Sequence, residues 1–208
     1  MRAVKLSLCF LTLTMAFTLV GCNQSSTSQK ALPHALSPAV RPTTRSTLTL
    51  TSKVKANPVR LLIPAIGVNA PIESVGVLLN GELAVPTLEP WEDVGWYKSG
   101  PRPGERGSAV IDGHLDRLGG SPAVFWRLRD MHIGNEVMVI DASGKTFRFH
   151  VTGIAFYSPQ NAPIQEIFGN ESGIYLNLIT CAGDWIPSQH QTNLRLVVYT
   201  SLEPIRKT

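Results

Sequence analysis

"GIYLNLITC", residues 173–181, is a mostly apolar run that ends at a cysteine. Its residues alternate with a period of two, as in a strand that has one buried face. The alternation gives two sets of side chains on opposite faces: Leu176, Leu178 and Thr180 on one, and Tyr175, Asn177, Ile179 and Cys181 on the other. "AGDWIPS" follows with the composition of a loop. The stretch therefore predicts a β-strand with Cys181 at its end, where reactive groups are often found.

Similar short runs recur along the chain from Pro58 onward, separated by Gly, Pro, Asn and Asp. They are "VRLLI" (59–63), "APIESVGV" (70–77), "ELAVPT" (82–87), "SAVIDGH" (108–114), "EVMVIDA" (136–142), "KTFRFHVTGIAFY" (145–157) and "LRLVVYTS" (194–201). "DASGKT" lies between two of them and has the composition of a hairpin turn. Eight short strands with turn signals between them predict a mainly β fold, a barrel or a sandwich.

Helical signals are few in this part of the chain. "SPAVFWRLRDM" (121–131) predicts one short helix, with Ser121 as the N-cap and Pro122 at the first position. "PIQEIFG" (163–169) predicts a further helical turn that Gly169 ends. The fold class is thus mainly β with one or two short helices.

The first 57 residues differ in composition from the rest. Residues 1–22 have a basic start and an uncharged apolar run, which predicts an export signal. Residues 23–57 are rich in Ser, Thr, Pro, Ala and Lys and contain no aromatic residue, which predicts a flexible tether. Within that part only "TLTLTSKV" (47–54) alternates enough for a short strand.

"LVGC", residues 19–22, resembles the lipobox of bacterial lipoproteins, and by that resemblance Cys22 is a lipidated anchor. The alternative is an uncleaved signal anchor in which Cys22 is an incidental thiol. Both readings place the rest of the chain outside the cytoplasm.

The net charge of +4 is unevenly distributed. Residues 1–57 carry seven basic groups and no acidic one, whereas residues 58–208 carry twelve basic and fifteen acidic groups. The positive charge is therefore concentrated in the predicted export signal and tether, next to anionic lipid or wall polymer. The folded part has no basic stripe of the kind that nucleic-acid binding needs, and we expect no nucleic-acid partner.

Cys181 is the only cysteine after residue 22, so the exported domain has no disulfide partner for it. A free cysteine is most often a buried structural thiol, whereas a nucleophilic one needs a base such as histidine. His114 closes "AVIDGH" at a strand end, behind a glycine that permits close backbone approach. His190 follows Cys181 in the next loop, and His132 and His150 occupy ordinary positions.

Arg195 lies one residue inside an otherwise apolar strand. A guanidinium there must be paired with an anion, exposed to solvent or part of a functional site, since burial without a partner is costly. Arg195 is either on a solvent-exposed strand face or a cation that stabilises negative charge on an oxygen atom.

"LITC" with an Arg fourteen residues later and "GH" far upstream resembles the sortases, cysteine transpeptidases whose pattern reads "TLxTC". "VRLLIPAIGVNAPI" (59–72) resembles their opening strand pair, and "DVGWYKSGPRPGERGSAVIDGHLD" (93–116) resembles the segment before the catalytic His of class F sortases. Two features depart from the pattern: Leu178-Ile179 replaces Thr-Leu, and a lipobox stands where sortases usually have a transmembrane helix.

The resemblance implies a closed sortase-type barrel of about eight strands over residues 58–208, with Cys181 as nucleophile, His114 as general acid/base and Arg195 as the oxyanion and substrate stabiliser. Thr180 matches a position that lines the substrate groove. The implied reaction cleaves an LPXTG-like sorting signal through a thioacyl enzyme and transfers the acyl group to an amine, without a cofactor or metal.

The implied partners are surface proteins with a C-terminal sorting signal and a peptidoglycan precursor or other amine. The implied location is the outer face of the cytoplasmic membrane of a Gram-positive bacterium. The alternative is a lipid-anchored β-barrel binding module in which Cys181 is inert. A metal site of Cys181, Asp184, His190 and His114 lacks a compact ligand spacing.

Overall fold

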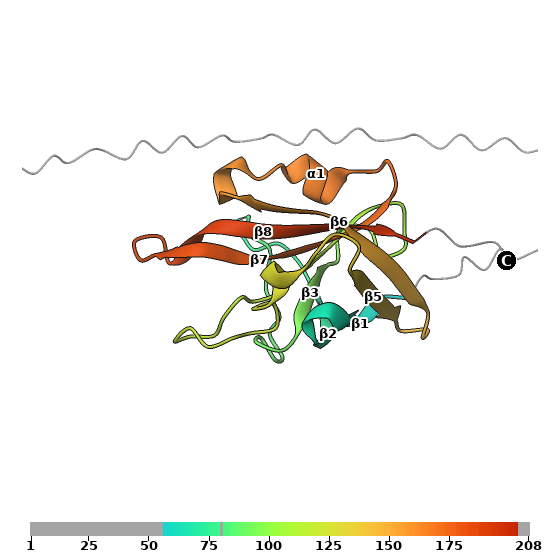
Figure 1. Cartoon of the computed structure of the whole chain (residues 1–208), viewed down its shortest axis with the longest axis horizontal. Helices are drawn as coiled ribbons and strands as arrows, with labels where there is room; N and C mark the ends of the chain where they lie inside the picture. The colour runs from blue at the N-terminus through green and yellow to red at the C-terminus, as the bar shows by residue number, and fades with distance from the viewer. Residues whose placement is uncertain (1–55, 80, 204–208) are drawn as a thin grey trace, which may run out of the picture. The chain divides into compact units, whose positions relative to one another are not determined.

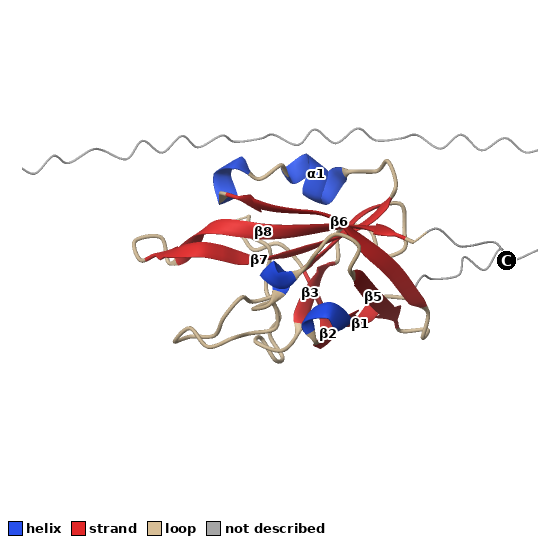
Figure 2. Ribbon diagram, in the orientation of Figure 1, coloured by secondary structure: helices blue, strands red, loops and turns tan. Residues whose placement is uncertain are grey.

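The computed structural model describes residues 56–79 and 81–203. Eight strands make up most of the regular secondary structure in this part of the chain (Figures 1 and 2). They are β1 (Pro58–Ile63), β2 (Val68–Val75), β3 (Val94–Tyr97), β4 (Gly107–Asp112), β5 (Glu136–Asp141), β6 (Thr146–Tyr157), β7 (Ile174–Ile186) and β8 (Gln191–Leu202). The helical elements are short: η1 (Pro64–Ile66), η2 (Leu128–Asp130), η3 (Pro159–Asn161) and α1 (Ile164–Gly169).

The strands close into a barrel in the order β1-β2-β3-β4-β7-β8-β6-β5. Most neighbours are antiparallel, but β2 is parallel to β3, and β4 is parallel to β7 with Asp112 opposite Ile179. Parallel strands end at the same edge of a sheet. The pairing of β4 with β7 therefore brings the segments after Asp112 and after Ile179 to one end of the barrel. The prediction of a mainly β, closed eight-stranded fold is confirmed.

The barrel interior is filled by the apolar face of each strand. Leu176 and Leu178 are fully buried, as their alternation predicts. A second, smaller cluster lies on the outer face, where Ile167 of α1 packs with Val110 of β4 and Val197 of β8. Asn177 of β7 also faces outward and is buried because its Nδ2 donates a 2.6 Å hydrogen bond to the Ile167 carbonyl. The segment with α1 thus covers part of the outer face of the sheet.

One predicted strand is wrong and another was missed. Residues 82–87 form no strand, and Leu83 makes only an isolated bridge to Val77. The remaining strand is β3, whose sequence VGWY is too short to show an alternation of polar and apolar residues. The hydrogen bonds from β2 and β4 define it, and these come from residues distant in sequence.

The predicted helix at 121–131 is also wrong, apart from the single turn η2 at its end. The backbone N–H groups of Ala123, Val124 and Phe125 donate to carbonyls of Leu115, Trp91 and His114. Those donors are therefore used in contacts between loops. The helical turn at 163–169 is confirmed as α1, and the hairpin turn between β5 and β6 is confirmed by the Gly144 N–H bond to Asp141.

The predictions for the signal at 1–22, for nearly all of the tether at 23–57 and for the strand at 47–54 lie outside the described residues. No helix among the described residues is long and apolar enough to cross a membrane.

Candidate active site

Two hydrogen bonds join the segment before His114 to the segment before Cys181. The Gly113 N–H donates to the Ile179 carbonyl at 3.2 Å. The Thr180 hydroxyl donates to the Gly113 carbonyl at 2.8 Å. Each bond connects Gly113, which precedes His114, with a residue one or two positions before Cys181, so the end of β4 and the middle of β7 hold His114 and Cys181 in one region.

Thr180 itself points into the barrel and is 3% exposed. Its hydroxyl already has a partner in the Gly113 carbonyl. The predicted role of Thr180 in lining a substrate groove stays a prediction, and the geometry gives this side chain a role in positioning its neighbours.

Cys181 lies on the outer face of the barrel, is partly exposed and is the one free cysteine of the described residues. It pairs with Arg195 across the antiparallel β7–β8 ladder. Directly opposite residues of such a ladder project to the same face, with Cβ atoms about 4.5–5.5 Å apart. Register shifts after Ala182, where Gly183 takes a left-handed φ of 76°. Such a bulge next to a site re-aims the strand beyond the thiol.

The Arg195 guanidinium is held toward the β7–β8 turn by four hydrogen bonds. Nη1 donates to the Leu194 carbonyl at 2.9 Å and to the carbonyl and hydroxyl of Thr192 at 3.1 and 3.2 Å. Nη2 donates to Gln191 Oε1 at 2.8 Å. All four acceptors are neutral, so these bonds orient the cation while leaving its charge for an anionic group beside Cys181.

His114 is partly buried and lies against Trp91, with ring centroids 4.9 Å apart and planes tilted by 48°. Burial lowers its pKa below the ordinary 6.5, and the nearby carboxylate of Asp116 opposes that shift. Gly113 permits the close approach predicted from the sequence, because a Cβ there would lie 2.8 Å from Phe125 and 2.9 Å from Val124.

Trp91 was not singled out from the sequence, because its role depends on a loop with no regular pattern. That loop is tied down by Glu73 of β2, whose carboxylate accepts hydrogen bonds from the backbone N–H groups of Thr87 and Leu88. The Trp91 carbonyl in turn accepts from Val124 N–H at 2.8 Å. The His114 side of the site is therefore built from loops joined to each other.

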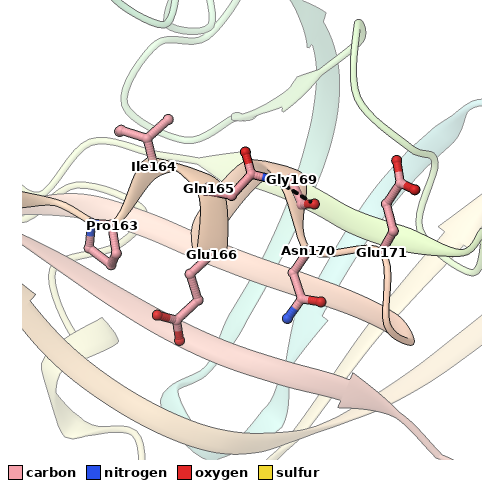
Figure 3. Close-up of a pocket in the computed structure, with 7 residues that line it drawn as sticks. All are labelled: Pro163, Ile164, Gln165, Glu166, Gly169, Asn170 and Glu171. Carbon is pink, nitrogen blue, oxygen red and sulfur yellow. Dashed lines mark hydrogen bonds between the residues drawn. The ribbon is translucent and has the colours of Figure 1, made fainter.

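The outer face of the sheet is recessed where α1 covers it. A cavity of about 230 Å³ opens there, lined by Ser108, Thr152, Gly153, Glu166, Asn170, Tyr175, Asn177, Tyr199 and Thr200. A wider depression of about 660 Å³ lies around α1 (Figure 3), and its lining residues belong to 163–171. Figure 3 shows Glu166 and Asn170 extending on the same side of this segment. Neither recess is lined by Cys181, His114 or Arg195, and the β7 residues of the smaller one, Tyr175 and Asn177, lie four to six positions before Cys181.

Two other described histidines, His190 and His150, lie away from Cys181. His190 occupies the turn between β7 and β8 with a φ of 52°, beyond the Ile186–Gln191 pair. That pair is five residues past Cys181, on the order of 15 Å along a strand. His150 instead lies 3.6 Å from Glu203 on the far part of β6. Within the described residues, no group of three His, Cys, Asp or Glu side chains has the arrangement of a metal site.

Known protein structures resemble this barrel. Sortase C-1 from Actinomyces oris matches with a TM-score of 0.55 and 22% identity, over 71% of this chain and 72% of that chain. Sortase A from Corynebacterium diphtheriae matches at 0.56 and 18%, over 75% and 65%. A sortase D5 transpeptidase from Clostridium perfringens matches at 0.52 and 20%, over 73% and 83%. At these identities the likeness shows the fold.

No curated protein sequence matches this chain. The family model described as the sortase domain matches residues 61–203, which is more than half of the chain. The chain therefore belongs to the sortase family of cysteine transpeptidases.

Proposed function

We propose that this sortase cleaves an LPXTG-like sorting signal and transfers the acyl part to an amine of the cell envelope, with Cys181, His114 and Arg195 as its catalytic residues. The observation that carries the assignment is the pairing of Cys181 with Arg195 in the β7–β8 ladder, while Thr180 and Gly113 join the Cys181 strand to the His114 segment. A nucleophile, a base and a cation then lie on one face of the barrel.

In the first half-reaction His114 takes the thiol proton, and the Cys181 sulfur attacks the scissile carbonyl carbon. Negative charge develops on the carbonyl oxygen, and the guanidinium of Arg195, the residue paired with Cys181, is the cation that we assign to stabilise it. The C–N bond then breaks, and His114 gives its proton to the leaving amine. The product is a thioester between Cys181 and the acyl part of the peptide.

In the second half-reaction an incoming amine attacks the thioester carbon and gives a proton to His114. The C–S bond breaks, and the thiolate recovers a proton from His114. The lowered pKa of His114 supports its role as a base, because the imidazole is neutral at neutral pH. Partial burial of the histidine also limits the access of water to the thioester.

The test is cleavage of an LPXTG-type peptide, in the presence of an amine, by the full chain and its variants. We expect Cys181→Ala and His114→Ala to abolish turnover and Arg195→Ala to lower kcat/KM by about 10²–10³-fold. Mass spectrometry of the wild type should find a thioester on Cys181. Cleavage by Cys181→Ala at the wild-type rate would refute the proposal and favour a non-catalytic binding module.

The finer assignments are also proposals. Resemblance of residues 93–116 supports class F, and the "LVGC" sequence supports lipidation of Cys22 and a place on the outer face of the cytoplasmic membrane of a Gram-positive cell. Labelled fatty acid should attach to the wild type and not to Cys22→Ser. Equal labelling of both would exclude the lipid anchor.

A further inference from the structure

Asp112 is the last residue of β4 and lies on the same outer face as Cys181. It pairs with Gly95 of β3 on one side and with Ile179 of β7 on the other. Ile179 and Cys181 are two residues apart on β7, and alternate residues of a strand share a face. Asp112 therefore lies in the floor of the outer face, roughly 7 Å along the strands from the level of the thiol.

The carboxyl group of Asp112 is poorly satisfied. Oδ1 is buried and has no hydrogen-bond partner among the described residues. It occupies the space over Gly95, where a Cβ would lie only 2.4 Å from Oδ1. The residue as a whole keeps part of its surface exposed, although Oδ1 itself is covered. Buried polar atoms are nearly always hydrogen-bonded, so this atom requires an explanation.

No cation among residues 56–79 and 81–203 compensates this carboxyl group. Burial raises the pKa of Asp112 to about 7, against the influence of its own backbone N–H, and no charged neighbour contributes. Glu73, opposite Gly95, is itself acidic and is occupied by Thr87 and Leu88. Arg195 is on β8, beyond β7, and is bound to the residues of its own turn. The free protein thus presents an unpaired acceptor in an otherwise apolar part of the floor.

The proposed reaction supplies a partner for it. The acyl part of the peptide stays on the enzyme through the thioester, and we take it to lie over the outer face of β4 and β7 around Asp112. We propose that Asp112 is a specificity-determining residue that accepts a hydrogen bond from an N–H or O–H donor side chain in the acyl part of the substrate. This inference rests on the proposed function.

The test compares peptides in which each position before the scissile bond is Lys, Gln or Leu. We expect one position at which the wild type favours Lys and Gln over Leu by about tenfold or more in kcat/KM, as a hydrogen bond to a charged group predicts. Asp112→Ala should lose this preference. Asp112→Asn should keep the preference for Gln over Leu and lose the preference for Lys over Leu. Asp130→Asn removes an exposed carboxylate elsewhere and should keep the wild-type profile.

Binding gives a readout that is independent of turnover. Peptide affinities of Cys181→Ala and of Cys181→Ala/Asp112→Ala should differ at the same position as the kinetic profiles. Identical side-chain preferences with and without Asp112 would overturn the inference, even if the peptides are cleaved. The absence of a thioester on wild-type Cys181 would instead refute the proposed function. The binding comparison would still decide the role of Asp112.

Asp112→Asn also tests the burial of the carboxyl group through the pH dependence of stability. Because the folded-state pKa of Asp112 lies above the ordinary 3.8, its favourable contribution is complete below pH 3.8 and is lost as pH rises through about 7. The asparagine cannot ionise, so the Tm of Asp112→Asn relative to the wild type should increase between pH 4 and pH 8. A constant difference over this range would show that the carboxyl group is not buried in the way described.

Discussion

The two sides of the active site are built in different ways. Cys181 and Arg195 lie on the regular β7–β8 ladder, where backbone hydrogen bonds set their register. His114 follows the end of β4 and is surrounded by the loops that contain Trp91 and Phe125. A ladder distributes its stability over many similar bonds, whereas the loop side depends on a few individual contacts. A single substitution on the loop side should therefore have a larger effect on the placement of His114 than a similar substitution elsewhere.

Gly113→Ala should have the largest effect on the loop side. Its new Cβ would overlap Phe125 and Val124, so we expect a loss of about 1–3 kcal/mol in the free energy of unfolding. Displacement of His114 should also lower kcat/KM by at least about tenfold, because catalysis requires close placement. Denaturant unfolding and peptide cleavage measure the two effects.

Gly76→Ala is the matched control for this substitution. A Cβ at Gly76 would meet only the flexible Lys98 side chain at 3.6 Å, which is an ordinary contact. Its stability and activity should stay close to those of the wild type. Equal losses in both variants would mean that the packing behind His114 has no special importance.

The same contrast explains what could be predicted from the sequence. Alternation in "GIYLNLITC" predicts the strand and places Cys181 on the face opposite Leu176 and Leu178, because this pattern depends only on neighbouring residues. The four-residue strand β3 and the position of Trp91 follow from hydrogen bonds to residues distant in sequence. Asp112 sits in an apolar strand whose alternation says nothing about an unpaired oxygen. Local patterns thus predict the thiol side and miss most of the histidine side.

Thr180→Val should weaken the connection between the two sides. It removes the hydroxyl that donates to the Gly113 carbonyl and leaves that acceptor unpaired, which costs about 1–3 kcal/mol. Thr180→Ser keeps the hydroxyl and should retain most activity. kcat should fall several-fold in Thr180→Val, because His114 and Cys181 are less well positioned relative to each other.

Thr200→Val separates this effect from general destabilisation. Thr200 is fully buried and donates a similar 2.7 Å bond to the Leu176 carbonyl, between β8 and β7 and five residues before Cys181 on β7. It should lose comparable stability and keep its kcat at temperatures where it is folded. If both valine variants lose activity equally, Thr180 has only a structural role.

Trp91→Ala should change the pH dependence more than the stability. Burial is the main reason for the lowered pKa of His114, so removing the neighbouring indole should raise that pKa toward 6.5. The acid limb of kcat/KM then moves to higher pH, because the neutral imidazole is the base that we propose. Trp126→Ala removes an indole that stacks with Arg129 and should leave the limb in place. An unchanged limb in Trp91→Ala would show that other groups bury His114.

Asp116→Asn should have the smallest effect and the opposite sign. The Asp116 carboxylate favours the protonated imidazole and so raises the pKa of His114 against the influence of burial. Its removal should lower that pKa further and move the acid limb of kcat/KM to lower pH, with little change in the rate at neutral pH. High salt should reduce the difference between Asp116→Asn and the wild type, since a partly exposed charge is screened. A shift to higher pH in this variant would mean that Asp116 acts on His114 through structure and not through its charge.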